Sequence, residues 1–182
     1  MLVWRPVMDL PTAIAPQVMI NIRTIGIPDW PAIMAIQHQC YHLFDPEPLE
    51  VMQNKSALAP ACCWVAEHRG KVQGYLLCHP WRAHQPPPLS VPMQGLAGDE
   101  EFYLHDLAVA PEARGIGVGQ RLLATALAFA SEEGYQHAGL VAVQDAPAFW
   151  RKQGFVPAKT PKSLEEYGEG AVYMRLPLAE PA

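Results

Sequence analysis

The clearest hydrophobic pattern in the chain lies at residues 101–133. Residues 101–109 (EFYLHDLAV) mix aromatic and branched residues with polar ones, which favours a β-strand that ends before Pro111. A glycine-rich turn, residues 114–119 (RGIGVG), follows. Apolar residues then recur at helical spacing: Val118, Leu122, Ala126, Leu127 and Ala130. The pattern therefore predicts a strand, a turn and a helix.

The rest of the chain continues this alternation of short strands and helices. Upstream of the central segment we expect a strand at 20–25, a helix after Pro28, a second helix at 49–58, and strands at 62–67 and 72–79. Downstream we expect a strand at 137–143, a short helix at 146–154 and a closing strand at 170–178. The order indicates one α/β domain around a central sheet.

Length and composition bound the domain organisation. A chain of 182 residues with 50% hydrophobic residues can bury one sizeable core. Residues 1–18 carry three prolines and no sustained period, so we expect an irregular arm followed by a single domain at 19–182. Two interpretations of the arm stay open: the natural start is Met19, or the arm packs on the domain.

Charge and cysteine usage exclude several classes of partner. A net charge of −5 without a basic run argues against nucleic acid, and no apolar run reaches membrane-spanning length. The four cysteines form no C-x-x-C pair, which favours a reducing compartment and argues against structural zinc. We therefore expect a cytoplasmic protein that needs no metal.

The glycine-rich turn has the features of an anion site. Glycines let the backbone approach a ligand, and the first N–H groups of the following helix have no partner inside it. Together with the helix dipole they suit a phosphate or pyrophosphate. The spacing fits neither the P-loop, which needs a Lys after the glycines, nor the dinucleotide fingerprint, whose third glycine position is Gln120. It does fit R-x-x-G-x-G, as Arg114, Gly117 and Gly119.

This segment resembles the GCN5-related N-acetyltransferase (GNAT) superfamily. A second segment, A-x-x-[FL]-Y-x-x-x-G-F, is similar at Ala146, Phe149, Gly154 and Phe155, with Trp150 where the superfamily usually has tyrosine. The resemblance implies an α/β (α+β) fold: a mixed, mostly antiparallel, splayed sheet of six to seven strands flanked by about four helices. It also implies transfer of an acetyl group from acetyl-CoA to a primary amine of a small molecule or peptide, and a possible homodimer.

The resemblance also assigns the cofactor site. The turn would hold the pyrophosphate, the end of the central strand would pair with the pantetheine arm, and two aromatic residues would flank the cofactor. The residues expected to bind acetyl-CoA are Leu107, Ala108, Val109, Arg114, Gly115, Ile116, Gly117, Val118, Gly119, Gln120, Phe149 and Trp150.

Proton removal from the amine needs a titratable group on the central strand. Strict alternation places Glu101, His105 and Val109 on one face and Asp106 on the other. His105, whose imidazole ordinarily titrates near neutral pH, is the first candidate base. Glu101 is the second, acting through water, while Asp106 is expected to support structure. The alternative for His105 is a packed pocket residue.

Three further residues are candidates for binding the acceptor. His42, together with Asp45, lies between the first two helices, where the family borders its acceptor site; ordinary loop and capping roles are the alternative. Trp81 opens the proline-rich segment 80–100, which is either a wall of the acceptor pocket or a solvent-exposed elaboration. Tyr103 lies on the central strand and, like Tyr173, is a candidate to protonate the thiolate.

Trp150 raises a second functional hypothesis. In the family a tyrosine at this position commonly protonates the departing thiolate, and an indole N–H is not a usable acid. Either another group or solvent supplies that proton, or the domain is a weakly catalytic or non-catalytic acyl-CoA-binding regulatory module.

Overall fold

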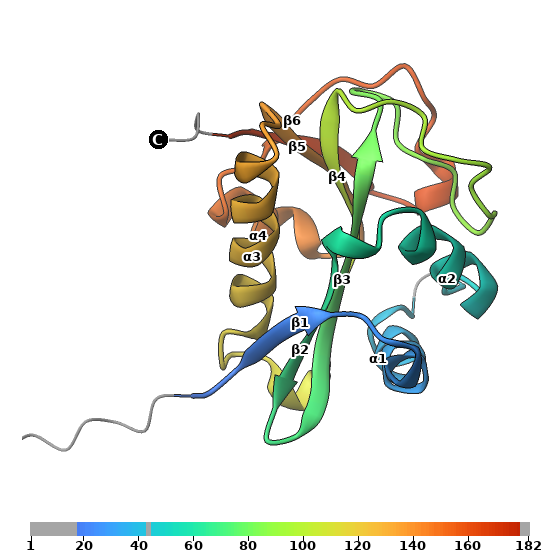
Figure 1. The fold of residues 1–182 in the computed structure, drawn as a ribbon. Coiled ribbons are helices and arrows are strands. Elements are labelled where there is room, and N and C mark those ends of the chain that lie inside the picture. Colours follow the sequence, from blue (N-terminus) through green and yellow to red (C-terminus); the bar gives the residue numbers. More distant parts are fainter. Residues whose placement is uncertain (1–17, 43–44, 179–182) are drawn as a thin grey trace, which may run out of the picture.

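The computed structural model describes residues 18–42 and 45–178. Seven strands form one open sheet in the order β1-β2-β3-β4-β5-β7-β6 (Figure 1). The strands are β1 (Asn21–Thr24), β2 (Cys63–His68), β3 (Lys71–Trp81), β4 (Glu101–Val109), β5 (His137–Ala142), β6 (Val156–Pro157) and β7 (Val172–Pro177). The arm predicted at 1–18 lies almost wholly outside the described residues, as do Leu43 and Phe44 in the predicted acceptor region.

Four α-helices lie on the two faces of the sheet (Figure 1). They are α1 (Trp30–Cys40), α2 (Leu49–Leu58), α3 (Val118–Glu132) and α4 (Ala146–Lys152). Short 3-10 helices add η1 (Ile27–Asp29), η2 (Pro60–Cys62), η3 (Pro111–Ala113) and η4 (Glu165–Tyr167). The predicted splayed, mixed sheet with four flanking helices is confirmed; the two-residue strand β6 was too short to leave a pattern.

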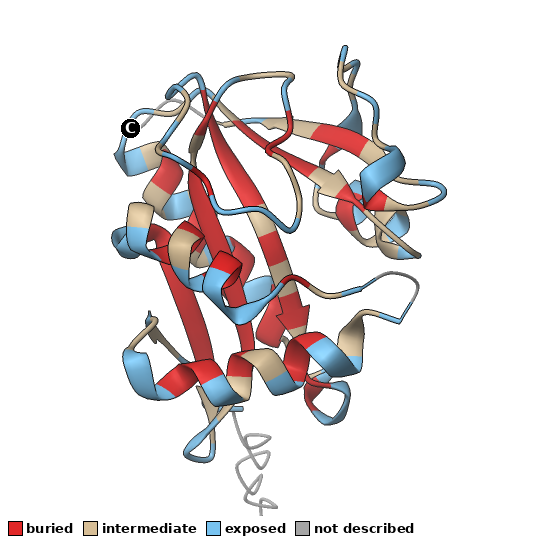
Figure 2. Cartoon of the chain, turned by 90° about the vertical axis from the view of Figure 1, so that its right-hand side faces the viewer, coloured by how far each residue is buried: buried red, intermediate tan, exposed pale blue. Residues whose placement is uncertain are grey.

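The core lies between the sheet and the helices on both faces. Figure 2 shows buried stretches running along the central strands. Helix α3 buries Val118, Leu122 and Ala126 at the predicted spacing. A Cβ added to Gly74 on β3 would lie 2.8 Å from Val118 Cγ1, so the bare glycine lets α3 pack closely on the sheet. No helix within the described ranges is long and apolar enough to cross a membrane.

The two central strands separate part-way along their length. Strands β4 and β5 are parallel and pair only at Phe102–Ala138 and Tyr103–Gly139. Beyond Tyr103, β4 has no pairing with β5, so its backbone groups on that side lack a neighbouring strand. The separation creates a cleft into which a ligand can place an extended arm.

A β-bulge at His105 changes which side chains share a face. Asp106 pairs with Leu77, but Leu104 pairs with Cys78, which leaves His105 as an extra residue on β4. The strict alternation predicted for this strand is therefore wrong. Asp106 lies on the same side as His105, toward α1 and α2, where it accepts a hydrogen bond from Tyr41.

Candidate active site

Two adjoining cavities form one continuous groove. The first, of about 320 Å³, lies at the glycine-rich turn. The second, of about 230 Å³, lies in the cleft between β4 and β5 and extends toward α1 and α2. Residues common to both linings are Leu107, Val109, Arg114, Ala146 and Trp150. One elongated ligand can therefore occupy both.

The backbone of the turn has the conformation that the glycines make possible. Gly115 has φ 83° and Gly117, the N-cap of α3, has φ 93°, a region that other residues rarely adopt. A Cβ added at either glycine would meet no atom within 4 Å, so packing does not explain their presence. The open space in front of the α3 N-terminus, beside Arg114, fits a pyrophosphate.

Most of the predicted cofactor residues line this groove. Ala108 and Trp150 line the cleft cavity. Around the turn, the lining includes Leu107, Val109, Arg114, Gly115, Val118, Gly119, Gln120 and Phe149. Gly117 contributes its backbone geometry, and neither it nor Ile116 is part of the lining.

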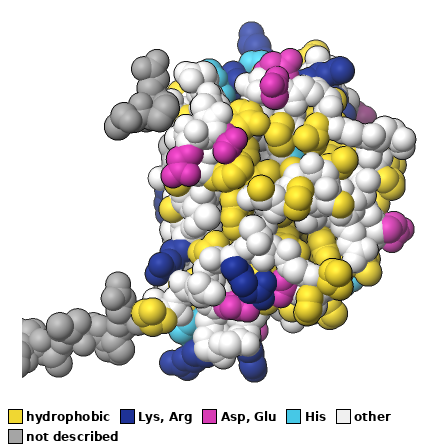
Figure 3. All heavy atoms as spheres, in the orientation of Figure 1, with side chains coloured by type: hydrophobic (Ala, Val, Ile, Leu, Met, Phe, Trp, Pro, Cys, Tyr) yellow, Lys and Arg dark blue, Asp and Glu magenta, His cyan; other side chains and the backbone are white. Residues whose placement is uncertain are grey.

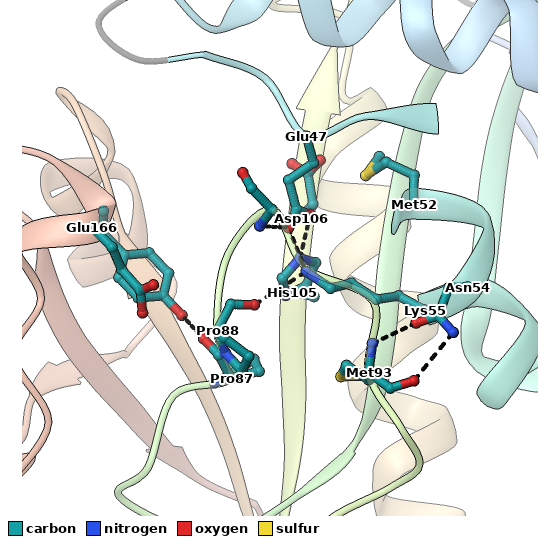
Figure 4. Close-up of polar contacts among 12 residues, drawn as sticks. Glu47, Met52, Asn54, Lys55, Pro87, Pro88, Met93, His105, Asp106 and Glu166 are labelled. Carbon is teal, nitrogen blue, oxygen red and sulfur yellow. Dashed lines mark hydrogen bonds and ion pairs between the residues drawn. The ribbon is translucent and has the colours of Figure 1, made fainter. Parts of the chain in front are cut away.

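His105 lies at the inner end of the cleft cavity and belongs to a buried polar cluster. Its Nε2 lies 2.7 Å from Glu47 Oε2 and 2.9 Å from Lys55 Nζ (Figure 4). Lys55 Nζ also donates to Glu47 Oε1. The His105 side chain is only 1% exposed and that of Lys55 is fully buried. We refer to Glu47, Lys55 and His105 as the polar triad.

The electrostatics of the polar triad fix the charge on Glu47. Burial acts to raise the pKa of Glu47, but His105 and Lys55 outweigh it and hold that pKa well below its usual range. Burial lowers the pKa of Lys55, and Glu47 offsets only part of this effect. Glu47 therefore stays ionised and anchors the histidine, while His105 Nδ1 has no hydrogen-bond partner among the described residues.

A second polar cluster lies beside the polar triad. Asp106 accepts hydrogen bonds from the hydroxyls of Tyr41 and Tyr75, the latter at 2.7 Å. Burial raises the pKa of Asp106, and the two tyrosine hydroxyls act in the opposite direction. Tyr41 and Asp106 also line the cleft cavity. The Asp106 carboxylate thus holds the Tyr41 hydroxyl at the wall of the cavity.

Glu101 lies elsewhere in the fold. Its buried carboxylate accepts a hydrogen bond from Tyr173 and forms an ion pair with Arg175 Nε at 3.0 Å. It is not part of the lining of the cleft cavity or of the turn cavity. The structure thus gives Glu101 partners on β7 and separates it from His105, with which the sequence pattern had grouped it.

We expect Gly139→Ala to destabilise the protein through this network. A Cβ at Gly139 would lie 2.5 Å from Glu101 Oε1, and the Glu101 carboxylate is held in place by Tyr173 and Arg175. Overpacking of this kind costs about 1–3 kcal/mol in the free energy of unfolding. Urea denaturation measures the loss, with Gly95→Ala, where an added Cβ meets no atom within 4 Å, as the matched control. Equal midpoints for the two variants would contradict the expectation.

None of the three residues predicted to bind the acceptor lines the cleft cavity. His42 is exposed, and its Nδ1 lies 3.3 Å from the carbonyl oxygen of Cys40. Trp81 is 8% exposed and donates from Nε1 to the carbonyl oxygen of Gln85. Tyr103 is buried beside His79. Trp81 therefore holds the loop through Gln85, and Tyr103 packs beside His79 and His105.

The sequence did not predict the residues that line this end of the cleft. Glu47, Leu89 and Tyr167 line the cavity. One signal was available for Lys55: α2 buries it together with Val51 and Met52, at positions that form one helical face. A lysine on an apolar face requires a buried partner, and Glu47 is that partner.

Comparison with known proteins identifies the family. The sequence profile of the acetyltransferase (GNAT) family matches residues 30–155. The chain belongs to this family. No curated protein sequence matches the chain significantly.

Solved structures share the GNAT fold at low sequence identity. The ribosomal-protein-S18-alanine N-acetyltransferase from Escherichia coli has a TM-score of 0.66 and 20% identity, with 90% of this chain and 97% of that chain covered. The NatC complex bound to Gag peptide and CoA has a TM-score of 0.67 and 18% identity, covering 88% and 99%. The GphF GNAT-like decarboxylase in complex with isobutyryl-CoA has a TM-score of 0.68 and 19% identity, covering 87% and 100%. At these identities the likeness shows the fold.

Trp150 occupies the junction of the GNAT groove. Its ring packs edge-on against Phe149, with centroids 5.0 Å apart, and against Phe155 at 5.3 Å. It is 7% exposed and lines both cavities. The indole thus forms an apolar wall where the two cavities meet.

Proposed function

We propose that the chain is an acetyl-CoA-dependent N-acetyltransferase that acts on a primary amine. The observation that carries the proposal is the continuous groove that begins at the α3 N-terminus, follows the unpaired part of β4 and ends at His105. Family membership supplies the reaction class, and the groove supplies a place for each part of the donor. Bound acetyl-CoA would supply the reactive thioester.

The chain's own residues hold the donor at two places. The start of α3 and Arg114 border the space that suits the pyrophosphate, where the helix N–H groups and the cationic side chain can bind an anion. Leu107, Ala108 and Val109 present β4 backbone that no neighbouring strand on the β5 side pairs with, so an extended arm can add there as a strand does. Holding donor and amine together removes much of the entropic barrier to attack.

His105 is the proposed base. An amine is protonated at neutral pH, and it must lose a proton before it can attack a thioester. Glu47 Oε2 and Lys55 Nζ both lie against His105 Nε2, so Nδ1, which has no hydrogen-bond partner among the described residues, is the nitrogen left to take the proton. Lys55 fixes Glu47 and the ring, so the base is held in place before substrate binds. Glu47 and Lys55 are therefore positioning residues.

Trp150 cannot protonate the departing CoA thiolate, so the proposed reaction must proceed without the tyrosine that the family usually has at this position. Thiols are acidic enough that the departing sulfur needs little assistance, and solvent at the open side of the groove can return its proton. Tyr103 and Tyr173 are buried outside both cavity linings. Trp150 favours the alternative, a weakly catalytic acyl-CoA-binding module, and the base in the cleft favours the enzyme.

The cofactor site is tested by substitution at Gly117. Gly117→Leu should weaken acetyl-CoA binding at least tenfold, because a side chain at positive φ strains the turn that presents the N–H groups of α3. Gly70→Leu is the matched control: Gly70 also has positive φ and open surroundings, but it lies in the β2–β3 turn. Calorimetric titration with acetyl-CoA measures both. Failure of the parent protein to bind acetyl-CoA would overturn the proposed function.

A further inference from the structure

A segment of the proline-rich loop crosses the inner end of the cleft and is fixed on both sides. We call residues 84–93 the strap. On one side the strap joins the β6–β7 connection: His84 Nδ1 lies 2.8 Å from the carbonyl oxygen of Lys159, and Thr160 Oγ1 donates to the carbonyl oxygen of His84 at 2.8 Å. The two segments are far apart in sequence and adjacent in space, at the upper right of Figure 1.

The same connection holds the prolines of the strap. Lys162 Nζ donates to the carbonyl oxygens of Pro86 and Pro87, both at 3.1 Å, and the Tyr167 hydroxyl donates to Pro87. Lys162 also pairs with Glu166 and lies over the Tyr167 ring. Proline has no backbone N–H, so carbonyl oxygens are the only backbone hydrogen-bonding groups at these positions, and they are used.

On its other side the strap is joined to α2 and the polar triad. Ser90 N donates to Glu47 Oε1 at 2.8 Å, and Lys55 Nζ lies 3.4 Å from the carbonyl oxygen of Pro88. Asn54 exchanges two hydrogen bonds with the backbone of Met93, at 2.7 and 3.2 Å (Figure 4). The strap is thus a bridge between the β6–β7 connection and α2.

The middle of this bridge lines the cleft cavity. Leu89, between the two sets of hydrogen bonds, is part of the lining together with His105, as is Tyr167 from the β6–β7 connection. The part of the groove that they line, the cleft cavity, has about 230 Å³, below the range of about 300–1,000 Å³ typical of drug-sized ligands. Part of that volume is needed for the acetyl group itself.

We propose that the strap restricts the acceptor to a compact primary amine with an apolar body, and excludes polypeptide N-termini. This inference rests on the proposed function. An amine at the end of a polypeptide must leave room for the following residues to pass out of the cleft, and the strap, hydrogen-bonded on both sides, lies against the cleft at Leu89. A compact amine needs no such exit.

The charges of the lining support an apolar body rather than an amino acid. Among the described lining residues, Arg114 and His105 are the basic ones. Arg114 faces the turn cavity as well, and His105 is paired with Glu47. A substrate carboxylate would therefore find no unengaged cation among the described residues near Leu89, whereas Pro46, Leu89 and Tyr167 offer apolar contact. Figure 3 shows one face of the molecule, with hydrophobic side chains gathered over its middle.

Two bisubstrate conjugates test the proposal without requiring turnover. CoA is joined through an acetyl spacer to 2-phenylethylamine in one conjugate and to the N-terminus of a hexapeptide in the other. By calorimetry we expect the compact conjugate to bind at least tenfold more tightly than CoA, and the peptide conjugate to bind no more tightly than CoA. Tighter binding of the peptide conjugate, or no gain for the compact one, would overturn the proposal.

A substitution in the strap locates the effect. Leu89→Trp should remove the gain of the compact conjugate while CoA affinity stays within about twofold. Leu96→Trp, at a 42% exposed position of the same loop outside the cavity lining, should preserve the gain. If Leu89→Trp leaves the gain intact, the strap does not limit the acceptor. Absence of CoA binding by the parent protein would instead mark failure of the proposed function, a result distinct from either of these.

Discussion

Replacing His105 by glutamine is expected to lower kcat/KM by about 10²–10⁴-fold, the range typical for loss of a positioned general base. Glutamine can still hydrogen bond to Lys55 and Glu47, so the polar triad keeps a partner at this position. It cannot take a proton from the amine. Steady-state assay of CoA release, with the amine that the conjugate experiment favours, measures the loss.

Two comparisons separate a catalytic loss from an indirect one. Acetyl-CoA affinity should stay within about twofold of the parent value, because His105 lies at the opposite end of the groove from the glycine-rich turn. His38→Gln, at an exposed position on α1, should leave kcat/KM unchanged. If His105→Gln retains activity within about threefold of the parent, His105 is a packed pocket residue, the alternative that the sequence had left open.

The positioning role of Lys55 has its own signature. Because Lys55 holds Glu47 and contacts Nε2 of the imidazole, its loss should move the pH dependence of kcat/KM as well as its size. A variant that merely weakens packing would lower stability and leave the pH profile in place. Comparing pH–rate profiles of Lys55→Met and the parent distinguishes the two.

The fold was predictable because its determinants are local. The sequence pattern at 101–133 predicts a strand, a turn and a helix, and the structure has β4 at Glu101–Val109 and α3 starting at Val118. The glycine turn was predictable for the same reason, since positive φ at Gly115 and Gly117 is a requirement of the backbone itself. These features need no knowledge of distant contacts.

The inner end of the site depends on contacts between distant segments. His105 and Asp106 share a side of β4 because of a bulge, and the bulge is visible only in the register against β3. Glu47 lies 58 residues before His105 in the sequence, and nothing local marks it as the partner of a histidine. Trp81 opens the loop, and the sequence leaves open whether that segment borders the pocket or is exposed to solvent; the structure instead places Leu89, further along the same loop, in the cavity lining. Loop composition predicts irregular structure. Which side chain of the loop lines the cavity depends on the hydrogen bonds that join the loop to the β6–β7 connection and to α2.

Stability below neutral pH is expected to depend on His79, which supports the His105 ring from β3. The His79 side chain is fully buried, with ring centroids 5.7 Å from His105 and 5.2 Å from Trp81. Its Nδ1 lies 3.0 Å from the carbonyl oxygen of Pro80, and Nε2 has no partner among the described residues. The groups facing it include the charged Lys55 and Glu47.

Burial, assisted by His105, lowers the pKa of His79 from its ordinary 6.5 to about 3. Between these values the unfolded chain binds a proton that the folded chain does not, so the free energy of unfolding falls as pH decreases below 6.5. Each pKa unit corresponds to 1.36 kcal/mol, which gives a loss of about 3 kcal/mol between pH 7 and pH 4.

His79→Phe should remove this component of the pH dependence. Phenylalanine keeps a ring against Trp81 and His105 but cannot bind a proton, so the variant's free energy of unfolding should decline less steeply than that of the parent as the pH falls. Urea denaturation at half-unit steps from pH 7 to pH 4 gives both curves. The difference between them isolates His79, because carboxylates such as Glu47 are present in both proteins. Parallel curves over this range would show that the pKa of His79 is the same in the folded and the unfolded chain. That result would contradict the inference that His79 is neutral where it packs beside His105.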